Sequence, residues 1–213
     1  MNSDIDLNKI AGVKLSPDKF LKIVDQVYNN LINIRDYGKL TRERANYPNI
    51  KKLIEELLPI KSYLINTNCS ELSWICWEGK DQKGDANTNT GIIEVTTAQL
   101  QNDYKKRQEL NKNGVCFSAK KIVDGKTQPY AYSSDEHIKD AINLIDEAIK
   151  KKASKNYPKQ TILVIAIFLD TLIDDDEAEL ITKFFHDEKH LLDPFKEIFV
   201  VNAFKWQPLA SIQ

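Results

Sequence analysis

The sequence contains few cysteines, and they are not spaced as a motif. Cys69, Cys76 and Cys116 include no C-x-x-C pair, and one of the three would stay unpaired even if the other two formed a disulfide. Sparse, unpaired cysteine is typical of proteins that fold in a reducing compartment. We therefore expect the protein to be cytoplasmic.

The sequence also lacks a long apolar run and an excess of charge of either sign. No uncharged apolar run reaches transmembrane length, and residues 1–6 do not combine a basic stretch with an apolar one as a signal peptide would. Thirty basic residues against 31 acidic residues give a formal net charge of -1. We expect no membrane partner, and a surface that binds nucleic acid must be a local one.

Several widespread catalytic motifs are missing as well. The sequence has no phosphate-binding loop of the form G-x-x-x-x-G-K-[ST], no G-x-G-x-x-G and no G-x-S-x-G. Its histidines, His137, His186 and His190, do not form an H-E-x-x-H zinc site. His186 and His190 are four residues apart, but a metal site would need a nearby third ligand.

Apolar periodicity predicts an α/β protein. Helical spacing indicates a first helix over 16–38, which begins with Ser-Pro-Asp and ends at a glycine. Further helices are expected over 49–65, after residue 98 up to Gly114, from Ser133 into the lysine-rich segment 150–159, and from about residue 174. Continuous or alternating apolar residues indicate strands over 72–77, 91–98, 161–170 and 197–202, a hairpin within 115–132, and an edge strand or extension over 203–213.

The order of these elements predicts a mixed central sheet flanked by helices, with right-handed crossovers. We expect residues 1–66 to form an N-terminal helical segment packed on the core, and residues 67–213 to form the α/β core itself. Pro59 should bend or break the second helix, because proline lacks the amide that continues helical bonding.

One predicted strand, residues 91–98, carries a single carboxylate, Glu94. Alternation along a strand puts Glu94 on the face opposite Ile93 and Val95, and on the same face as Thr96. An ionised carboxylate is costly to bury unless a metal, a cation or hydrogen-bond donors compensate it. Either this is an edge strand that exposes Glu94 to water, or the carboxylate has a function.

A second acid, Asp85, comes nine positions earlier at the end of a polar connector. Two carboxylates that converge at a hairpin can bind Mg²⁺, which can activate water and neutralise a phosphate under attack. The other acidic groups have simpler interpretations. Adjacent Glu55 and Glu56 suit the solvated face of a helix, and the acids at 174–177 suit a helix N-terminus.

An acid, then a strand with a second acid, then a helix resembles the PD-(D/E)XK superfamily of restriction-endonuclease-like nucleases, over about residues 50–202. In that family an Asp and a downstream (D/E)-x-K on adjacent strands hold a divalent metal. The resemblance implies that Asp85 and Glu94 are catalytic metal ligands and that Mg²⁺ is the cofactor.

The motif departs from the family pattern at two positions. Gly84 stands where a proline would precede the first acid, and Thr96 occupies the position of the lysine. Some members of the superfamily recruit this lysine from a neighbouring helix, which makes Lys105 and Lys106 the catalytic candidates. The sequence is also similar to bacterial proteins that combine an acid, an I-E-V-T strand, a Tyr/Arg-bearing helix and a K-x-Y segment. The matching residues suggest one surface: Asp85, Glu94, Tyr104, Arg107, Lys155 and Tyr157.

Five lysines lie within residues 150–159, where the predicted long helix ends. Cations at a helix C-terminus are favoured by the helix dipole, and a lysine cluster also suits phosphate binding. Under the second interpretation, DNA or RNA is the partner. The expected contacts are Arg107, Lys151, Lys152, Lys155 and Lys159.

Three functional hypotheses follow. The first is a metal-dependent, nuclease-like protein that hydrolyses phosphodiester bonds in DNA or RNA. The second is a catalytically inactive nuclease-like fold that binds nucleic acid or a protein. In the third, the N-terminal helices bind a second copy or another protein, with Trp74, Trp77 and Trp206 as candidate anchors, although the first two also suit core packing.

Overall fold

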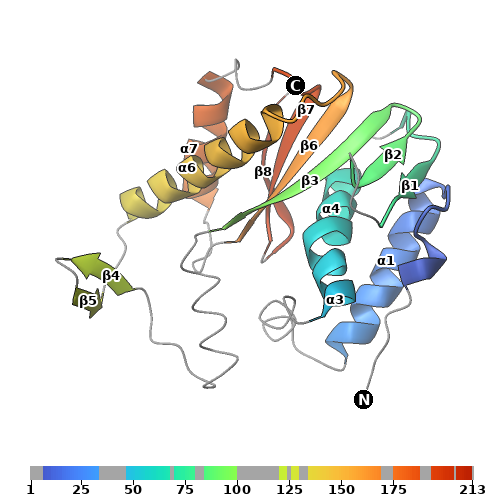
Figure 1. Cartoon of the computed structure of the whole chain (residues 1–213), viewed down its shortest axis with the longest axis horizontal. Coiled ribbons are helices and arrows are strands. Elements are labelled where there is room, and N and C mark those ends of the chain that lie inside the picture. Colours follow the sequence, from blue (N-terminus) through green and yellow to red (C-terminus); the bar gives the residue numbers. More distant parts are fainter. Residues whose placement is uncertain are drawn as a thin grey trace.

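The computed structural model is a six-stranded mixed sheet with helices on both faces (Figure 1). The residues that it describes are 7–33, 47–67, 70–79, 84–99, 120–123, 126–129, 134–168, 175–187, 193–203 and 205–212. The prediction of an α/β protein with a mixed sheet, flanking helices and an N-terminal helix is confirmed. Among the described helices, none is long and apolar enough to cross a membrane.

The first long helix, α1 (Pro17–Ile32), begins as its sequence predicts. The Ser16 hydroxyl accepts a hydrogen bond from the Lys19 amide at 3.4 Å, and the proline occupies the first turn. Phe20, Val24 and Leu31 are buried along one face. The helix ends at Ile32, earlier than the glycine signal at position 38 predicts.

The second helix is continuous through a wide turn. It consists of the segments α3 (Pro48–Lys52), η3 (Leu53–Leu57) and α4 (Leu58–Asn66). In η3, a π-helical turn, the Leu58 amide bonds to the Leu53 carbonyl five residues earlier. The wider turn relieves the clash that the ring of Pro59 would make with the preceding turn. The helix therefore continues past Pro59 instead of breaking there.

The strand order of the sheet is β1-β2-β3-β6-β7-β8. The strands are β1 (Ile75–Trp77), β2 (Ala86–Thr88), β3 (Gly91–Gln99), β6 (Thr161–Phe168), β7 (Glu197–Asn202) and β8 (Gln207–Ile212). The first three form an antiparallel meander, β3, β6 and β7 are parallel, and β8 returns antiparallel. A separate hairpin, β4 (Lys120–Val123) with β5 (Lys126–Pro129), forms within the predicted range.

Two sequence predictions about strands need correction. β2 lies in a stretch expected to be only a connector, and β1 covers just the last three residues of the predicted strand 72–77. The helix expected between residue 98 and Gly114 lies outside the described residues.

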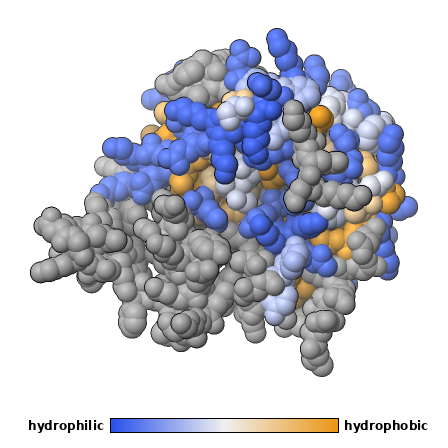
Figure 2. Space-filling model, viewed as in Figure 1, coloured by the Kyte–Doolittle hydropathy of each residue, from blue (hydrophilic) through white to orange (hydrophobic). Residues whose placement is uncertain are grey.

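Each face of the sheet is covered by its own pair of helices. α1 and α4 pack on one face, and α6 (Ser134–Ala153) and α7 (Asp175–Asp187) pack on the other. β6 is buried along its whole length, with Ile162 and Val164 towards α4, and Leu163 and Ile165 towards α6. Hydrophilic side chains cover most of the outer surface over α6 (Figure 2). The same alternation along β3 decides which helices its side chains meet.

Candidate functional site

Pairing of β2 with β3 brings Asp85 and Glu94 together. Ala86 is opposite Ile93 in the register, so Asp85, one residue before β2, lies beside Glu94. The Asp85 amide donates to the Ile93 carbonyl at 2.9 Å, and the Val95 amide donates to Asp85 Oδ2 at 2.6 Å. These bonds fix the Asp85 carboxylate against the strand that carries the second acid.

Glu94 is buried, with only 4% of its surface exposed. β3 lies inside the sheet between β2 and β6, so the interpretation of an edge strand that exposes Glu94 to water is wrong. Ile93 and Val95 belong to the core beneath α4, whereas Glu94 meets residues from the end of α6. The predicted alternation is therefore correct, but both faces are covered.

Gly84 positions Glu94 through its backbone. Its amide donates to Glu94 Oε2 at 3.0 Å, and its φ is +85°. A proline could not replace it, because proline has no amide hydrogen and its φ is fixed near -65°. A Cβ here would lie 2.2 Å from Ile92 Cγ2. The local geometry thus explains why residue 84 is a glycine.

Lys152, at the end of α6, supplies the cation of the site. Its ammonium donates a hydrogen bond to Glu94 Oε1 and another to the Val95 carbonyl at 3.2 Å. Only 12% of the Lys152 side chain and 6% of the Glu94 side chain are exposed. We expected Lys152 among the phosphate contacts on the surface, but it lies inward against the carboxylate. The sequence indicated this inward position, because Lys152 lies on the same face of the helix as the apolar residues Ile145 and Ile149.

Tyr157 lies near Glu94. Its side chain is buried, and it is close enough to the Glu94 carboxylate for the two groups to interact electrostatically. Burial is the largest cause that raises the pKa of the Tyr157 hydroxyl, and the Glu94 and Asp85 carboxylates add to it, so the hydroxyl stays protonated. Asn156, with φ +52°, occupies the left-handed region after the end of α6, where asparagine is tolerated. The reversal of the chain there turns Tyr157 back towards the sheet.

Glu56 lies near the same site. The indole of Trp77 donates to Glu56 Oε2 at 2.9 Å, and Glu56 is half-buried in the π-helical turn η3. Its negative charge raises the pKa of Asp85. The interpretation of Glu56 as part of a solvated face is therefore wrong. The sequence did not indicate this position, because adjacent glutamates on a helix usually point to water.

Burial and neighbouring carboxylates make Asp85 difficult to ionise. Burial is the largest cause that raises the pKa of Asp85, to about 7, and the charges of Glu94 and Glu56 add to it. The hydrogen bond from Val95 and the charge of Lys152 act in the opposite direction. A divalent cation would favour the ionised form, because it brings positive charge to a site rich in carboxylates.

The residues that could hold a cation here are the two carboxylates, Asp85 and Glu94. The described parts of the chain contain no group of three or more His, Cys, Asp or Glu side chains close enough to hold a metal by themselves. Mg²⁺, however, is commonly bound through one or two carboxylates, with water and substrate phosphates as its other ligands. Asp85 Oδ1 accepts no hydrogen bond from the described residues.

The other predicted site residues divide into two groups. Lys151, Lys155 and Lys159 are exposed in the segment that contains Lys152 and Tyr157. The predicted candidates on the helix after residue 98 lie outside the described residues: Tyr104, Lys105, Lys106 and Arg107. His190 also lies outside them, and His186 is exposed on α7.

The tryptophans proposed as partner anchors differ in burial. Trp77 is in the core with 1% exposed, as its alternative interpretation predicts. Trp74 is half-buried, and the Lys14 ammonium lies 4.2 Å from the centroid of its ring. Trp206 packs partly buried against the core. Binding of a second copy or another protein through the N-terminal helices stays a prediction.

Comparisons of the chain with protein-family models, with curated proteins and with solved structures find no match. The functional conclusions below therefore rest on the residues of this chain.

Proposed function

We propose that the protein is a restriction-endonuclease-like nuclease that hydrolyses phosphodiester bonds in DNA or RNA with the help of Mg²⁺. One observation carries this proposal: Lys152 from α6 contacts Glu94, which lies beside Asp85. The cation absent at Thr96 is thus supplied by a helix. The order of the strands also supports the resemblance, because an antiparallel meander of β1, β2 and β3 is followed by the parallel strand β6. Asp85 lies just before β2, and Glu94 lies within β3.

Each residue of the site has a chemical role in this proposal. Asp85 and Glu94 would hold Mg²⁺, which when bound supplies a Lewis acid that activates water and neutralises phosphate charge. Lys152 places a positive charge where negative charge develops on the phosphate oxygens. The Gly84 amide holds the Glu94 carboxylate through its hydrogen bond, and the protonated hydroxyl of Tyr157 lies near the same carboxylate. Burial of this cluster strengthens its electrostatic interactions.

Exposed lysines next to the site provide local attraction for nucleic acid. Lys151, Lys155 and Lys159 lie within eight residues of Lys152 along the chain, and all three are exposed. The net charge of -1 gives the whole protein no general affinity for polyanions. Binding should therefore depend on this segment, and phosphate contacts from it would place a backbone near the carboxylates.

A second candidate function is binding of nucleic acid without cleavage. The ion pair of Glu94 with Lys152, and the bond of Glu94 to Gly84, engage both oxygens of this carboxylate even without a metal. Such a pair can have a structural role alone. The same fold and the same exposed lysines would then serve recognition.

Cleavage assays separate these functions. Purified protein is incubated with plasmid, single-stranded DNA and single-stranded RNA in Mg²⁺, Mn²⁺ or EDTA. We expect metal-dependent cleavage by wild type, and a loss of at least about 100-fold in Glu94→Gln and in Lys152→Met. Lys150→Met is the matched control on the same helix, because Lys150 pairs with Asp146 instead.

Absence of cleavage by wild type, together with absence of bound divalent metal in titration calorimetry, would reject the catalytic proposal. Salt-dependent binding of the same substrates without cleavage would support the second candidate. Cleavage that persists in Glu94→Gln would place the chemistry elsewhere in the chain.

A further inference from the structure

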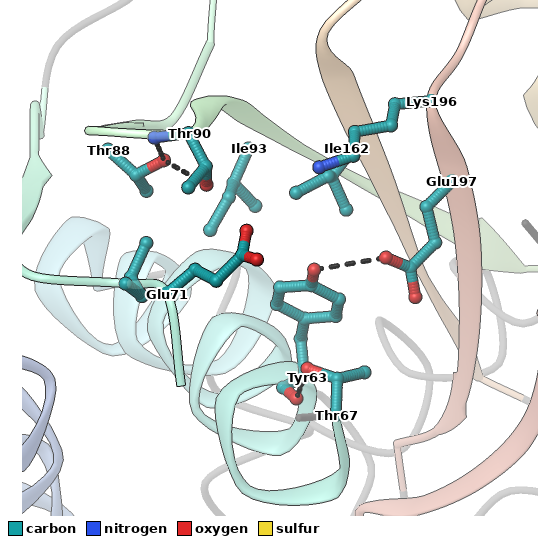
Figure 3. Close-up of a pocket in the computed structure, with 10 residues that line it drawn as sticks. Tyr63, Thr67, Glu71, Thr88, Thr90, Ile93, Ile162, Lys196 and Glu197 are labelled. Atoms are coloured by element: carbon teal, nitrogen blue, oxygen red, sulfur yellow. Dashed lines mark hydrogen bonds between the residues drawn. The ribbon is translucent and has the colours of Figure 1, made fainter. Parts of the chain in front are cut away.

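A polar pocket lies on the face of the sheet that carries α4. It has a volume of about 340 Å³, at the small end of the ~300–1,000 Å³ range of ligand pockets. Tyr63 from α4, Ile93 from β3, Ile162 from β6 and Glu197 from β7 line it (Figure 3). Ile93 and Glu94 are neighbours in one strand and point to opposite faces, so this pocket is separate from the carboxylate site.

Glu197 is the unusual residue of this pocket, because it is buried with 4% exposed. The Tyr63 hydroxyl donates to Glu197 Oε2 at 3.1 Å, and the Ser211 hydroxyl donates to Glu197 Oε1 at 2.9 Å. A carboxylate offers about four acceptor positions, so two neutral donors leave capacity for more. Among the described residues, no lysine, arginine or histidine forms an ion pair with Glu197.

The rest of the lining also favours a positively charged ligand. Glu71, at the opposite wall, directs its carboxylate into the pocket (Figure 3). The side-chain amide of Asn89 donates a hydrogen bond to the backbone carbonyl of Glu71 at 2.8 Å. Lys196 is the one lining residue of opposite charge; it is exposed, and its side chain is directed towards Ile162 (Figure 3). Two carboxylates against one ammonium leave the lining negative. The ring of Tyr63 and the side chains of Ile93 and Ile162 add an apolar surface.

We propose that this pocket binds a small organic cation, with an ammonium or guanidinium group on an apolar or aromatic body. The cationic group would bond to Glu197 and compensate the buried charge, since burial of an unpaired carboxylate is costly. Glu71 would add a second attraction at the mouth, and the body would lie on the Tyr63 ring. This site does not depend on nuclease activity, and the binding measurement below does not report on cleavage.

Calorimetry with matched probes tests the proposal. Tyramine is compared with tyrosol, in which a hydroxyl replaces the ammonium, and butylguanidinium is compared with butylurea. We expect each cation to bind at least about tenfold more tightly than its neutral partner, because hydrogen bonds to charged groups are the stronger ones. Equal affinity of cationic and neutral probes, or binding of neither, would overturn the proposal. Displacement of the cations by Mg²⁺ alone would indicate a metal site and would also overturn it.

Variants locate the binding. Glu197→Gln keeps the size of the side chain and removes its charge, and it should weaken cation binding at least about tenfold. Glu179→Gln, an exposed site on α7, is the matched control and should leave affinity unchanged. If Glu197→Gln does not fold, as judged by circular dichroism, Glu71→Gln at the exposed mouth should still weaken binding by about threefold. Unchanged affinity in both pocket variants would reject this location.

Discussion

The Lys152 ammonium donates a hydrogen bond to the Glu94 carboxylate across 58 residues of sequence. Both side chains are almost fully buried, so each charge depends on the other. Loss of one partner of a buried pair leaves the other charge unpaired, which typically costs about 3–5 kcal/mol. Lys152→Met should therefore lower the free energy of unfolding by about 3 kcal/mol in urea denaturation, and should also abolish cleavage.

A double variant distinguishes pairing from packing. Glu94→Gln with Lys152→Met should be more stable than Lys152→Met alone, because no buried charge is left without a partner. Lys150→Met, which breaks an exposed pair with Asp146, should cost at most about 0.5 kcal/mol. If Lys152→Met is no less stable than Lys150→Met, the buried ion pair does not stabilise the fold.

Asp85 should make stability fall as pH rises. Its pKa is raised to about 7 in the folded protein, from an ordinary value of 3.8, mainly by burial. The folded state then binds the proton more tightly than the unfolded state, so this stabilisation is complete below about pH 4 and is lost as pH rises through about 7. Asp85→Asn removes the dependence, and the Asn oxygen can still accept from Val95.

Urea denaturation in EDTA, from pH 4 to pH 8, measures this effect. We expect Asp85→Asn to become progressively more stable relative to wild type between about pH 4 and pH 7, with no further change above that. A difference between the two proteins that is constant over this range would contradict the raised pKa.

Gly84→Ala should destabilise the protein more than an ordinary substitution of glycine at positive φ. The left-handed region costs a non-glycine residue about 1–2 kcal/mol, and the new Cβ would also meet Ile92. Gly12→Ala is a matched control, since Gly12 has φ +71° and nothing within 4 Å of its Cβ position. In thermal denaturation, the melting temperature should be highest for wild type, lower for Gly12→Ala and lowest for Gly84→Ala. Equal melting temperatures for the two variants would show that the contact with Ile92 relaxes without cost.

The exposed lysines should determine the salt dependence of nucleic-acid binding. Each phosphate contact contributes about 0.7–0.9 to the slope of log affinity against log salt. Replacement of Lys151, Lys155 and Lys159 by glutamine should therefore reduce the slope by about 2–3, as measured by fluorescence anisotropy with a labelled oligonucleotide.

A control triple variant keeps the same change in net charge. Lys19, Lys22 and Lys205 are exposed elsewhere in the chain and are likewise replaced by glutamine. This protein should retain the wild-type slope. An equal reduction in both triple variants would show that net charge, rather than the segment around Lys152, determines binding.

The sequence predicts much of the fold because its strongest patterns are local. The apolar run of β6 and the β-branched run of β3 identify central strands, and the alternation around Glu94 gives its face correctly. The sequence does not indicate β2, because this strand has only three residues, Ala86, Asn87 and Thr88, and two of them are polar. So short a stretch shows no apolar alternation. Without β2, β3 could be taken for an edge strand, and the exposure of Glu94 followed from that error.

The site itself was only half predictable. Asp85 and Glu94 are near each other in sequence, and a hairpin between them is a local inference. The position of Lys152 depends on how α6 crosses the sheet, which no local pattern specifies. The sequence offered one indication that Lys152 points inward: it continues the apolar face of its helix. Glu56 lies near the site because η3 packs against β3, which no local pattern specifies either.

Under the proposed function, division of the site between the β2–β3 hairpin and the end of α6 bears on when during folding the site is assembled. The acids and the lysine lie on opposite sides of residues 100–133 in the sequence. A folding intermediate that had formed the hairpin before α6 docked would hold two carboxylates without their cation. Catalytic competence would then appear only with the last docking step, and recovery of cleavage during refolding would time that step.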